Sequence, residues 1–510
     1  MATTFLLSCQ KEDNLDNVQI DDFESIDVLN DKTILGKQLE NPYSVENMKK
    51  ALSELKSSNT LKSSSMDDDF EIETTHLYVR FLPKDEEEFD LLKQDTLLHF
   101  YDYPLDYEIT APGIYYHDPT LPDTVITWQY TVVSPDYDFP KVKHEILSEL
   151  FLIEEKDDDS NLKSATVNIP FWDMLEDKAL EITGNLDNNT ISGTVLKSSK
   201  WRPAGRIRAW DDVLDKYVPI VGVEVKARRW FTTHKGTTNS SGNFSCDGTF
   251  KRDANYSFSW ERYHFSIRSG TVGQANYNGP KKKGDWNLDI KGNKSQFYAT
   301  IYRATNHYYY GNRLGLRRPP ENGLLKPQMK IAAMYKTNND KNGRHAASLR
   351  VLGIFNWIKI WNPENRCNQI YGTTIHELAH ASHWDMGSSD YNNTSLIVKE
   401  SWARGVQWAL TRLEYPTYSI SYSRLDYTGI VQDLIDGNKT TSSSYHSKYG
   451  TFSVKTYSDQ VSGYTIRQIE DALKGKRNWD DWKTNIKSKY SNGTKDNVDA
   501  AFNYWNSKQL

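Results

Sequence analysis

Residues 365–385 read NRCNQIYGTTIHELAHASHWD, and His376-Glu-Leu-Ala-His380 within them is the strongest functional signal in the chain. We expect this stretch to be a helix. Residues four apart share one helix face, so the two imidazoles can converge on one metal ion. Glu377 lies one residue round the helix, where it can face a water on that ion and take its proton. The stretch therefore predicts a metal centre with a general base.

A catalytic zinc site needs a third protein ligand and an open fourth position. The metzincin spacing requires a glycine at position 383 and a ligand at position 386, but the chain has His383 and Met386 there. His383 shares the face of the other two histidines, yet it lies about 4.5 Å beyond His380 along the axis, which makes convergence difficult. We therefore expect His383 to orient a neighbouring residue or to lie at the solvent-exposed edge of the site. The third candidate is Glu400, at the start of a second amphipathic helix.

Nineteen residues separate His380 from Glu400, and Ser-Trp-Ala follows the glutamate. This pattern resembles the gluzincin metallopeptidases, of which thermolysin is the familiar member. The resemblance implies Zn²⁺ as cofactor, His376, His380 and Glu400 as its ligands, and Glu377 as the general base.

One position departs from the thermolysin pattern. Thermolysin-like enzymes carry an aspartate four residues after the glutamate ligand to orient a histidine, and this chain has Arg404. That orienting role would pass to Asp385, Asp433 or a backbone carbonyl.

Peptide hydrolysis also needs a donor for the oxyanion that forms on the attacked carbonyl. Tyr464, just before a predicted helix, is the first candidate. Tyr391 lies in the loop between the two metal helices, where thermolysin-like enzymes keep a tyrosine. His446 is a third candidate.

The composition restricts the class of protein. With 510 residues, the chain is expected to form two to four domains. Its formal charge of -6, with no basic block, argues against a nucleic-acid partner. The three cysteines lie far apart, so they predict neither a disulfide framework nor a cysteine zinc site.

The N-terminal 70 residues are expected to be a signal remnant and a flexible tether. Phe5 to Cys9 resembles a bacterial lipobox, and the acidic residues that follow resemble the surface-export signal of Bacteroidetes lipoproteins. The resemblance implies a lipid anchor on Cys9 and a protein that is secreted, or held at the outer membrane or cell surface. No other apolar run is long enough to span a bilayer.

The fold expected for the rest is multidomain α+β. Residues 71–165 read as a small α+β domain with strands near Leu77 to Phe81 and Val125 to Val133. Helices are expected at Asp85 to Gln94 and Lys141 to Glu154.

Residues 185–292 show short alternating strands separated by turns, which predict a β-sandwich. The sequence Val218-Pro-Ile-Val-Gly-Val-Glu-Val225 followed by Thr238-Asn-Ser-Ser-Gly-Asn-Phe244 resembles carboxypeptidase regulatory-like (transthyretin-like) domains. That resemblance implies a spacer or stabilising module without chemistry of its own.

Residues 293–510 read as a mainly helical, zincin-like catalytic domain. Strands at Lys330 to Tyr335 and Trp357 to Trp361 precede the metal helix and offer an edge to which a peptide can add. Besides the metal helix, helices are expected at Ser295–Asn306, Ser395–Arg412, Tyr427–Ile435 and Tyr464–Lys474.

These features favour a zinc endopeptidase that hydrolyses extracellular proteins or peptides. The alternative is a catalytically inactive surface protein that uses the same fold for binding or adhesion, and the intact Glu377 argues against it. Whether the N-terminal α+β domain acts as an inhibitory prosegment is left open by the sequence.

Overall fold

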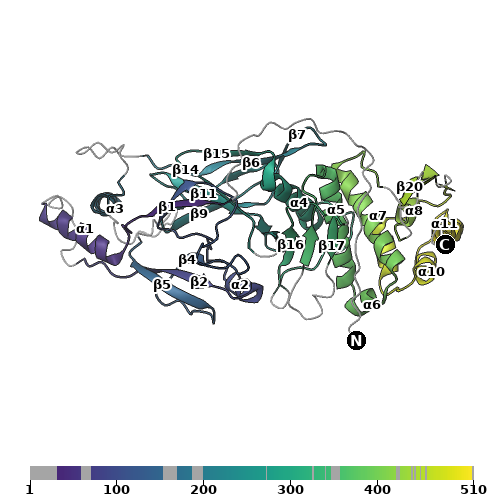
Figure 1. Ribbon diagram of the computed structural model, residues 1–510, viewed down its shortest axis with the longest axis horizontal. Coiled ribbons are helices and arrows are strands. Elements are labelled where there is room, and N and C mark those ends of the chain that lie inside the picture. Colours follow the sequence, from purple (N-terminus) through teal and green to yellow (C-terminus); the bar gives the residue numbers. More distant parts are fainter. Residues whose placement is uncertain are drawn as a thin grey trace, which may run out of the picture.

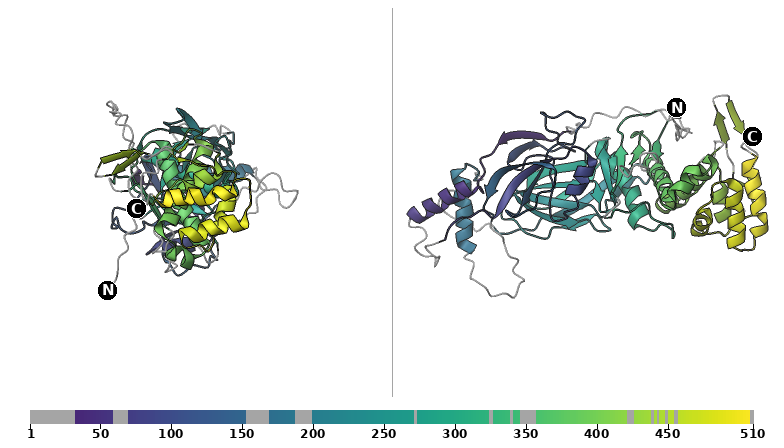
Figure 2. Two further views of the ribbon diagram at one scale, coloured as in Figure 1. Left: turned by 90° about the vertical axis from the view of Figure 1, so that its right-hand side faces the viewer. Right: turned by 90° about the horizontal axis from the view of Figure 1, so that it is seen from below.

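The computed structural model describes residues 32–58, 70–152, 169–186, 199–270, 273–323, 327–338, 341–345, 357–420, 426–437, 440–441, 444–447, 450–453 and 457–507. The chain forms a multidomain structure of mixed α and β type with several antiparallel sheets. The molecule is elongated, with α1 at one end and the C-terminal helices α10 and α11 at the other (Figures 1 and 2). Cys9 lies outside the described residues.

The described residues of the N-terminal region form two sheets and three helices. Strands β1 (Ile34–Gln38) and β3 (Tyr107–Ala111) pair antiparallel, and β4 (Gln129–Val133), β2 (His76–Leu82) and β5 (Lys143–Leu150) form a three-stranded sheet. Asp85 caps α2 (Glu86–Leu92) by accepting hydrogen bonds from the N–H groups of Glu87 and Glu88. Helices α1 (Val45–Ser57) and α3 (Ile169–Ile182) share one hydrophobic cluster, which contains Met48 and Leu175.

Two expectations for this region are wrong. Residues 143–150 form strand β5 instead of the predicted helix over Lys141 to Glu154, because the backbone pairs along the whole length of β2. Ile146 and Leu147 stay 54% and 40% exposed, so the apolar spacing that suggested a helix is not a buried face. The predicted tether does not extend over residues 32–58, because β1 pairs with β3 and α1 buries Met48 and Leu52.

The middle region contains two four-stranded sheets that contribute to one core. One sheet contains β10 (Asn243–Ser245), β6 (Ala204–Asp211), β15 (Trp286–Ile290) and β7 (Lys216–Pro219). The other contains β14 (Asn276–Lys282), β11 (Ala254–Ser259), β8 (Glu224–Arg229) and β9 (Thr232–Thr237). Ile207 and Val225, one from each sheet, belong to the same buried cluster. The stretch from Val218 to Val225 spans both sheets: β7 ends at Pro219, β8 begins at Glu224, and Gly222 between them takes a φ of 82°.

A five-stranded mixed sheet packs against the helix that carries His376 and His380. Its order is β12 (Glu261–Arg262), β13 (Phe265–Ser269), β16 (Met329–Ala333), β18 (Trp357–Ile360) and β17 (Gly343–His345). Strands β13, β16 and β18 are parallel, while β12 and β17 run antiparallel at the two edges. The sequence predicts a domain boundary at residue 293. Because β12 and β13 precede that residue, this sheet contains strands from both sides of the predicted boundary.

The C-terminal half carries most of the helices, together with strands β16 to β22. Helices α4 (Asn293–Tyr310) and α5 (Cys367–Asp385) lie next to the sheet, and α5 lies between α4 and α7 (Leu396–Glu414) (Figure 1). The remaining elements are α6 (Ser388–Asn393), α8 (Ile430–Ile435), α9 (Ile466–Leu473), α10 (Trp479–Lys489), α11 (Val498–Asn506), β19 (Thr440–Thr441), β20 (Ser444–Ser447), β21 (Gly450–Ser453) and β22 (Tyr457–Ser458). Among the described residues, no helix has both the length and the apolarity needed to cross a bilayer.

Candidate metal centre

Helices α5 and α7 bring the three predicted ligands together. Helix α5 is buried on almost every side, and Ile375, Leu378 and Ala379 on it are fully buried. His376 and His380 lie one turn apart on this helix, and Glu400 lies in the second turn of α7. The exposure of these three residues is 4%, 3% and 9%, so all of them lie inside the domain.

The three ligand atoms form a nearly equilateral triangle. Nε2 of His376 lies 3.1 Å from Oε2 of Glu400 and 3.1 Å from Nε2 of His380. Nε2 of His380 lies 3.3 Å from the same Glu400 oxygen. Ligand atoms about 2.0 to 2.1 Å from a tetrahedral ion are about 3.3 to 3.4 Å apart. The triangle therefore has nearly the dimensions of one face of such a tetrahedron, and the cluster can hold a metal ion.

The charges around the cluster suit a cation. Burial lowers the pKa of His376 to about 4, which keeps its imidazole neutral. Burial alone would raise the pKa of Glu400, but the neighbouring His380 and His376 bring it well below its usual range. Burial likewise opposes the charge on His380, and the Glu400 carboxylate overcomes it and raises the pKa. A neutral imidazole and an ionised carboxylate are the forms that bind metals, so His376 and Glu400 are ready for a cation, whereas His380 would release its proton when an ion binds.

Glu377 is fully buried beside this triangle and is not one of its corners. It faces Gly343 of edge strand β17, where a Cβ atom would lie 2.6 Å from Oε1 of Glu377. The missing side chain lets the strand approach the carboxylate. The side chain of Glu377 therefore points from α5 toward edge strand β17.

Tyr391 contacts the predicted ligand His380 on the side of its ring that faces away from the triangle. Its hydroxyl lies 3.2 Å from Nδ1 of His380, the ring nitrogen that points away from the triangle. The ammonium of Lys399 lies 4.8 Å from the centre of the Tyr391 ring, and the tyrosine is 6% exposed. A partner on the distal nitrogen fixes the tautomer and orientation of a ligating histidine. This contact suits Tyr391 to orienting His380, and its oxyanion role stays a prediction.

Tyr464 lies just before α9, where its N–H donates to the carbonyl of Leu434 in α8. Its hydroxyl is buried and makes no hydrogen bond within the described part of the chain. Burial raises the pKa of this hydroxyl. No described contact joins Tyr464 to the three ligands. His446 lies in β20, and only its backbone is described.

The other residues weighed for orienting roles have different neighbours. His383 is 4% exposed instead of lying at the solvent edge, and its ring packs edge-on against Tyr391 at 5.0 Å. Arg404 is buried, donates to Gln407 and lies 4.7 Å from the ring of Tyr427, which packs on His376.

The two aspartates suggested as orienting residues are placed elsewhere. Asp433 accepts a hydrogen bond from Trp505. Asp385 is exposed at the end of α5, about 13.5 Å along the axis from His376.

His345 is a candidate functional residue that the sequence analysis missed. It ends strand β17, and its ring stacks on that of His380 with a centroid distance of 6.3 Å and an interplanar angle of 10°. Side chains two apart share a strand face, so His345 and Gly343 both face α5, while Arg344 faces away. Its position depends on the pairing of β17 with β18, which has no local sequence signal.

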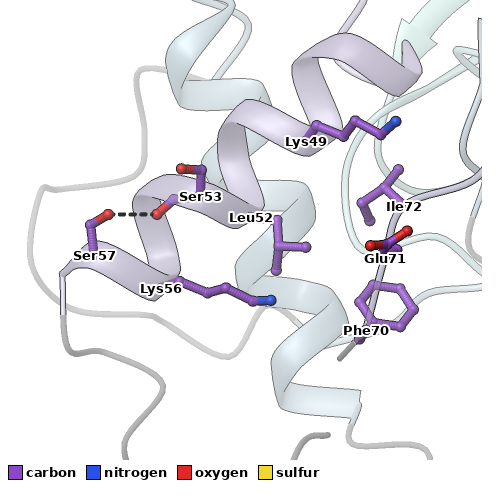
Figure 3. Close-up of a pocket in the computed structure, with 8 residues that line it drawn as sticks. All are labelled: Lys49, Leu52, Ser53, Lys56, Ser57, Phe70, Glu71 and Ile72. Carbon is purple, nitrogen blue, oxygen red and sulfur yellow. Dashed lines mark hydrogen bonds between the residues drawn. The ribbon is translucent and has the colours of Figure 1, made fainter. Parts of the chain in front are cut away.

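Another recess lies far from this cluster. A pocket opens on α1 at the opposite end of the molecule (Figure 3). It is lined by Lys49, Leu52, Ser53, Lys56, Ser57, Phe70, Glu71 and Ile72. Helix α1 contributes mostly polar side chains to it, with Leu52 as the apolar exception, and its lining contains neither histidine nor cysteine.

Comparisons with protein-family models, with curated proteins and with solved structures return no match for this chain. A functional assignment therefore rests on the residues and the geometry described above.

Proposed function

We propose that this protein is a zinc-dependent peptidase, with His376, His380 and Glu400 as zinc ligands and Glu377 as general base. The observation that carries the proposal is the triangle of ligand atoms, with sides of 3.1, 3.1 and 3.3 Å, beside a buried carboxylate. This is the geometry expected for a gluzincin-type site. A structural zinc site would have four protein ligands, whereas three ligands leave one position for water and substrate.

The donor set favours zinc over other cations. Two imidazole nitrogens and one carboxylate oxygen suit zinc, whereas calcium and magnesium prefer oxygen ligands alone. Zinc, when bound, supplies a Lewis acid for the scissile carbonyl and lowers the pKa of water toward neutrality. Glu377 has no part in holding the ion, so its carboxylate is available for proton transfer.

Glu377 would carry the proton in both halves of the reaction. It takes a proton from the attacking water and passes it to the nitrogen of the leaving amine. Burial suits this role, because a carboxylate shielded from bulk water keeps its proton for the leaving group. Gly343 supports it by letting β17 come close enough to confine the carboxylate.

Strand β17 is where a peptide substrate would bind. Within the described residues it is the last strand of its sheet, and its inward face lies on α5. An extended peptide adds to such an edge through main-chain hydrogen bonds, largely independent of its sequence. This arrangement favours an endopeptidase and brings the scissile bond toward Glu377 and His345. His345 then becomes the candidate for stabilising the oxyanion.

The remaining regions are proposed to be scaffold. The two four-stranded sheets would form the carboxypeptidase regulatory-like β-sandwich, and a lipid on Cys9 would hold the protein at the bacterial surface. The N-terminal region docks on the five-stranded sheet through Glu86, which pairs with Arg268 of β13 and Lys330 of β16. Because β13 lies on the side of the sheet away from β17, this docking favours a structural role over an inhibitory prosegment.

Hydrolysis of a peptide library tests the proposed function. Purified full-length protein should cleave library members, lose activity with a zinc chelator and regain it when zinc is added back. Metal analysis should find about one zinc per chain, and His376→Ala and Glu400→Ala should both lose it. If the wild type binds zinc but cleaves nothing in a broad library, the inactive binding protein becomes the better account.

A further inference from the structure

One face of the five-stranded sheet is rich in cations. Residues paired across neighbouring strands share a face, and the register places in one row Arg268 of β13, Ala332 of β16, Lys359 of β18 and Arg344 of β17. Lys330 lies on the same face, two residues before Ala332. Gly343, next to Arg344, faces Glu377 of α5, so the row lies on the opposite side of the sheet. We call this side the cationic face.

Carboxylates of α2 neutralise the cations in the middle of the cationic face. Glu86 pairs with both Arg268 and Lys330. In addition, Nζ of Lys330 lies 2.7 Å from Oδ2 of Asp90. Arg268 and Lys330 are 0% and 2% exposed, and each has an anionic partner within the chain.

The cationic face differs at its β17 end. Lys359 and Arg344 lie directly opposite each other on β18 and β17, and both are half-buried. Burial lowers the pKa of Lys359, and the nearby Arg344 and Lys336 lower it further. In the described part of the chain, neither Lys359 nor Arg344 pairs with a carboxylate. Like charges opposite each other destabilise a strand pair, so this arrangement favours an anion from another molecule.

The main chain of β17 would align an added peptide with these cations. The carbonyl of Asn342 accepts a hydrogen bond from the N–H of Trp361 at 2.8 Å. Alternate residues of an antiparallel strand bond to the same neighbour, so Arg344 bonds to β18 like Asn342. Gly343 and His345 then turn their main-chain groups toward the outer edge of the sheet. A peptide strand added there places one side chain beside that of Arg344, on the cationic face.

We propose that the substrate of this protein is an acidic peptide segment, whose carboxylates bind Arg344 and Lys359. This inference rests on the proposed function, because it concerns the peptide strand that β17 would hold beside the metal centre. Main-chain bonds give such a strand its affinity, and alternate side chains give it specificity. Because Gly343 lies against Glu377, the bond that is cut should be close to the acidic residue opposite Arg344.

Binding of matched peptides to full-length Glu377→Gln tests this proposal, because this variant should hold zinc without cutting. Short peptides that alternate threonine with glutamate present every carboxylate on one face of an extended strand. They should bind about threefold to tenfold more tightly than peptides that alternate threonine with glutamine. Peptides with lysine in place of glutamine should bind most weakly. Raising NaCl from about 0.05 to 0.5 M should reduce these differences.

Lys359→Glu in the same background is the most informative variant, since a carboxylate opposite Arg344 should pair with it and keep the sheet folded. This variant should lose the preference for glutamate peptides, and so should Arg344→Ala. Lys281→Ala is the matched control, because Lys281 is an exposed lysine on β14 of another sheet, and it should keep the preference. In a form that cleaves, Arg344→Ala should raise KM for glutamate peptides and change kcat little.

Cleavage by zinc-loaded wild-type protein is measured separately, so that the two proposals can fail independently. A preference for glutamate peptides without any cleavage would uphold this inference and overturn the peptidase proposal. Cleavage with equal affinity and equal kcat/KM for glutamate and glutamine peptides would do the reverse. The inference is also overturned if Lys359→Glu keeps the original preference, or if no peptide binds at about 1 mM.

Discussion

The Tyr391 hydroxyl lies 3.2 Å from Nδ1 of His380, on the side of the imidazole opposite Glu400. This contact lets the tyrosine fix which nitrogen of His380 faces the metal. We predict that Tyr391→Phe weakens zinc affinity by about 10-fold to 100-fold, while kcat at saturating zinc stays close to the wild-type value. Zinc titration against a competing chelator, with kcat measured on the zinc-loaded variant, checks this. A fall in kcat of about 10²-fold or more with unchanged zinc affinity would instead make Tyr391 the oxyanion donor.

Tyr464→Phe should leave both zinc affinity and kcat unchanged. The hydroxyl is buried and makes no hydrogen bond among the described residues, so its removal breaks no described contact. Removing a buried polar group without a partner should not destabilise the fold. Peptide hydrolysis and thermal unfolding of the variant check the prediction. A loss of about 10²-fold in kcat would restore Tyr464 as the oxyanion donor.

His345→Phe should lower kcat by about 10²-fold without zinc loss, the effect expected when one oxyanion donor is removed. The phenyl ring keeps the stacking on His380 but loses the N–H group. Arg344→Ala is the control on the same strand, since its side chain faces away from α5 and should affect kcat less. Equal kcat values for His345→Phe and wild type would assign His345 to packing.

Glu86 should contribute strongly to the stability of the contact between the N-terminal region and the sheet. It is 7% exposed and pairs with Arg268 and with Lys330, whose Nζ lies 3.0 Å from Oε2. Burial opposes its charge, yet Arg268 and Lys330 lower the pKa of Glu86, so this contribution persists above the usual carboxyl pKa and is lost in acid. Glu86→Gln should cost about 3 kcal/mol of unfolding free energy, because it leaves the buried Arg268 without its carboxylate, although Lys330 keeps Asp90 as a partner.

Glu87→Gln is the control for that measurement, because Glu87 is the exposed next residue of α2. Urea unfolding followed by fluorescence should show a change within about 0.5 kcal/mol for this control. Similar losses for the two variants would mean that the buried ion group does not stabilise the contact.

Local helix geometry made the centre of the site predictable. Helix α5 ends at Asp385, as expected, and starts at Cys367, two residues after the predicted start. The spacing of His376 and His380 places both on one face without any tertiary information. The prediction of Glu400 as the third ligand needed the family resemblance, because its distance from the two histidines depends on how α7 packs on α5.

The parts that were missed depend on pairing between distant segments. Strand β5 has apolar residues at a helical spacing, and its pairing with β2 decides the structure. Strand β13 joins the sheet of the metal helix across the predicted boundary at residue 293, through parallel pairing with β16. His345 reaches the site only because β17 pairs with β18. No short window of sequence contains this information.

The most direct test of the central claim is hydrolysis by Glu377→Gln, measured with its zinc content. Glu377 is not a ligand, so the variant should keep about one zinc per chain and a wild-type melting temperature. Removing a general base costs about 10² to 10⁴ in rate, or roughly 3 to 5 kcal/mol of barrier. The account predicts a zinc-loaded, folded variant whose hydrolysis falls by that factor. A zinc-loaded Glu377→Gln that cleaves the same peptides as fast as the wild type would contradict it.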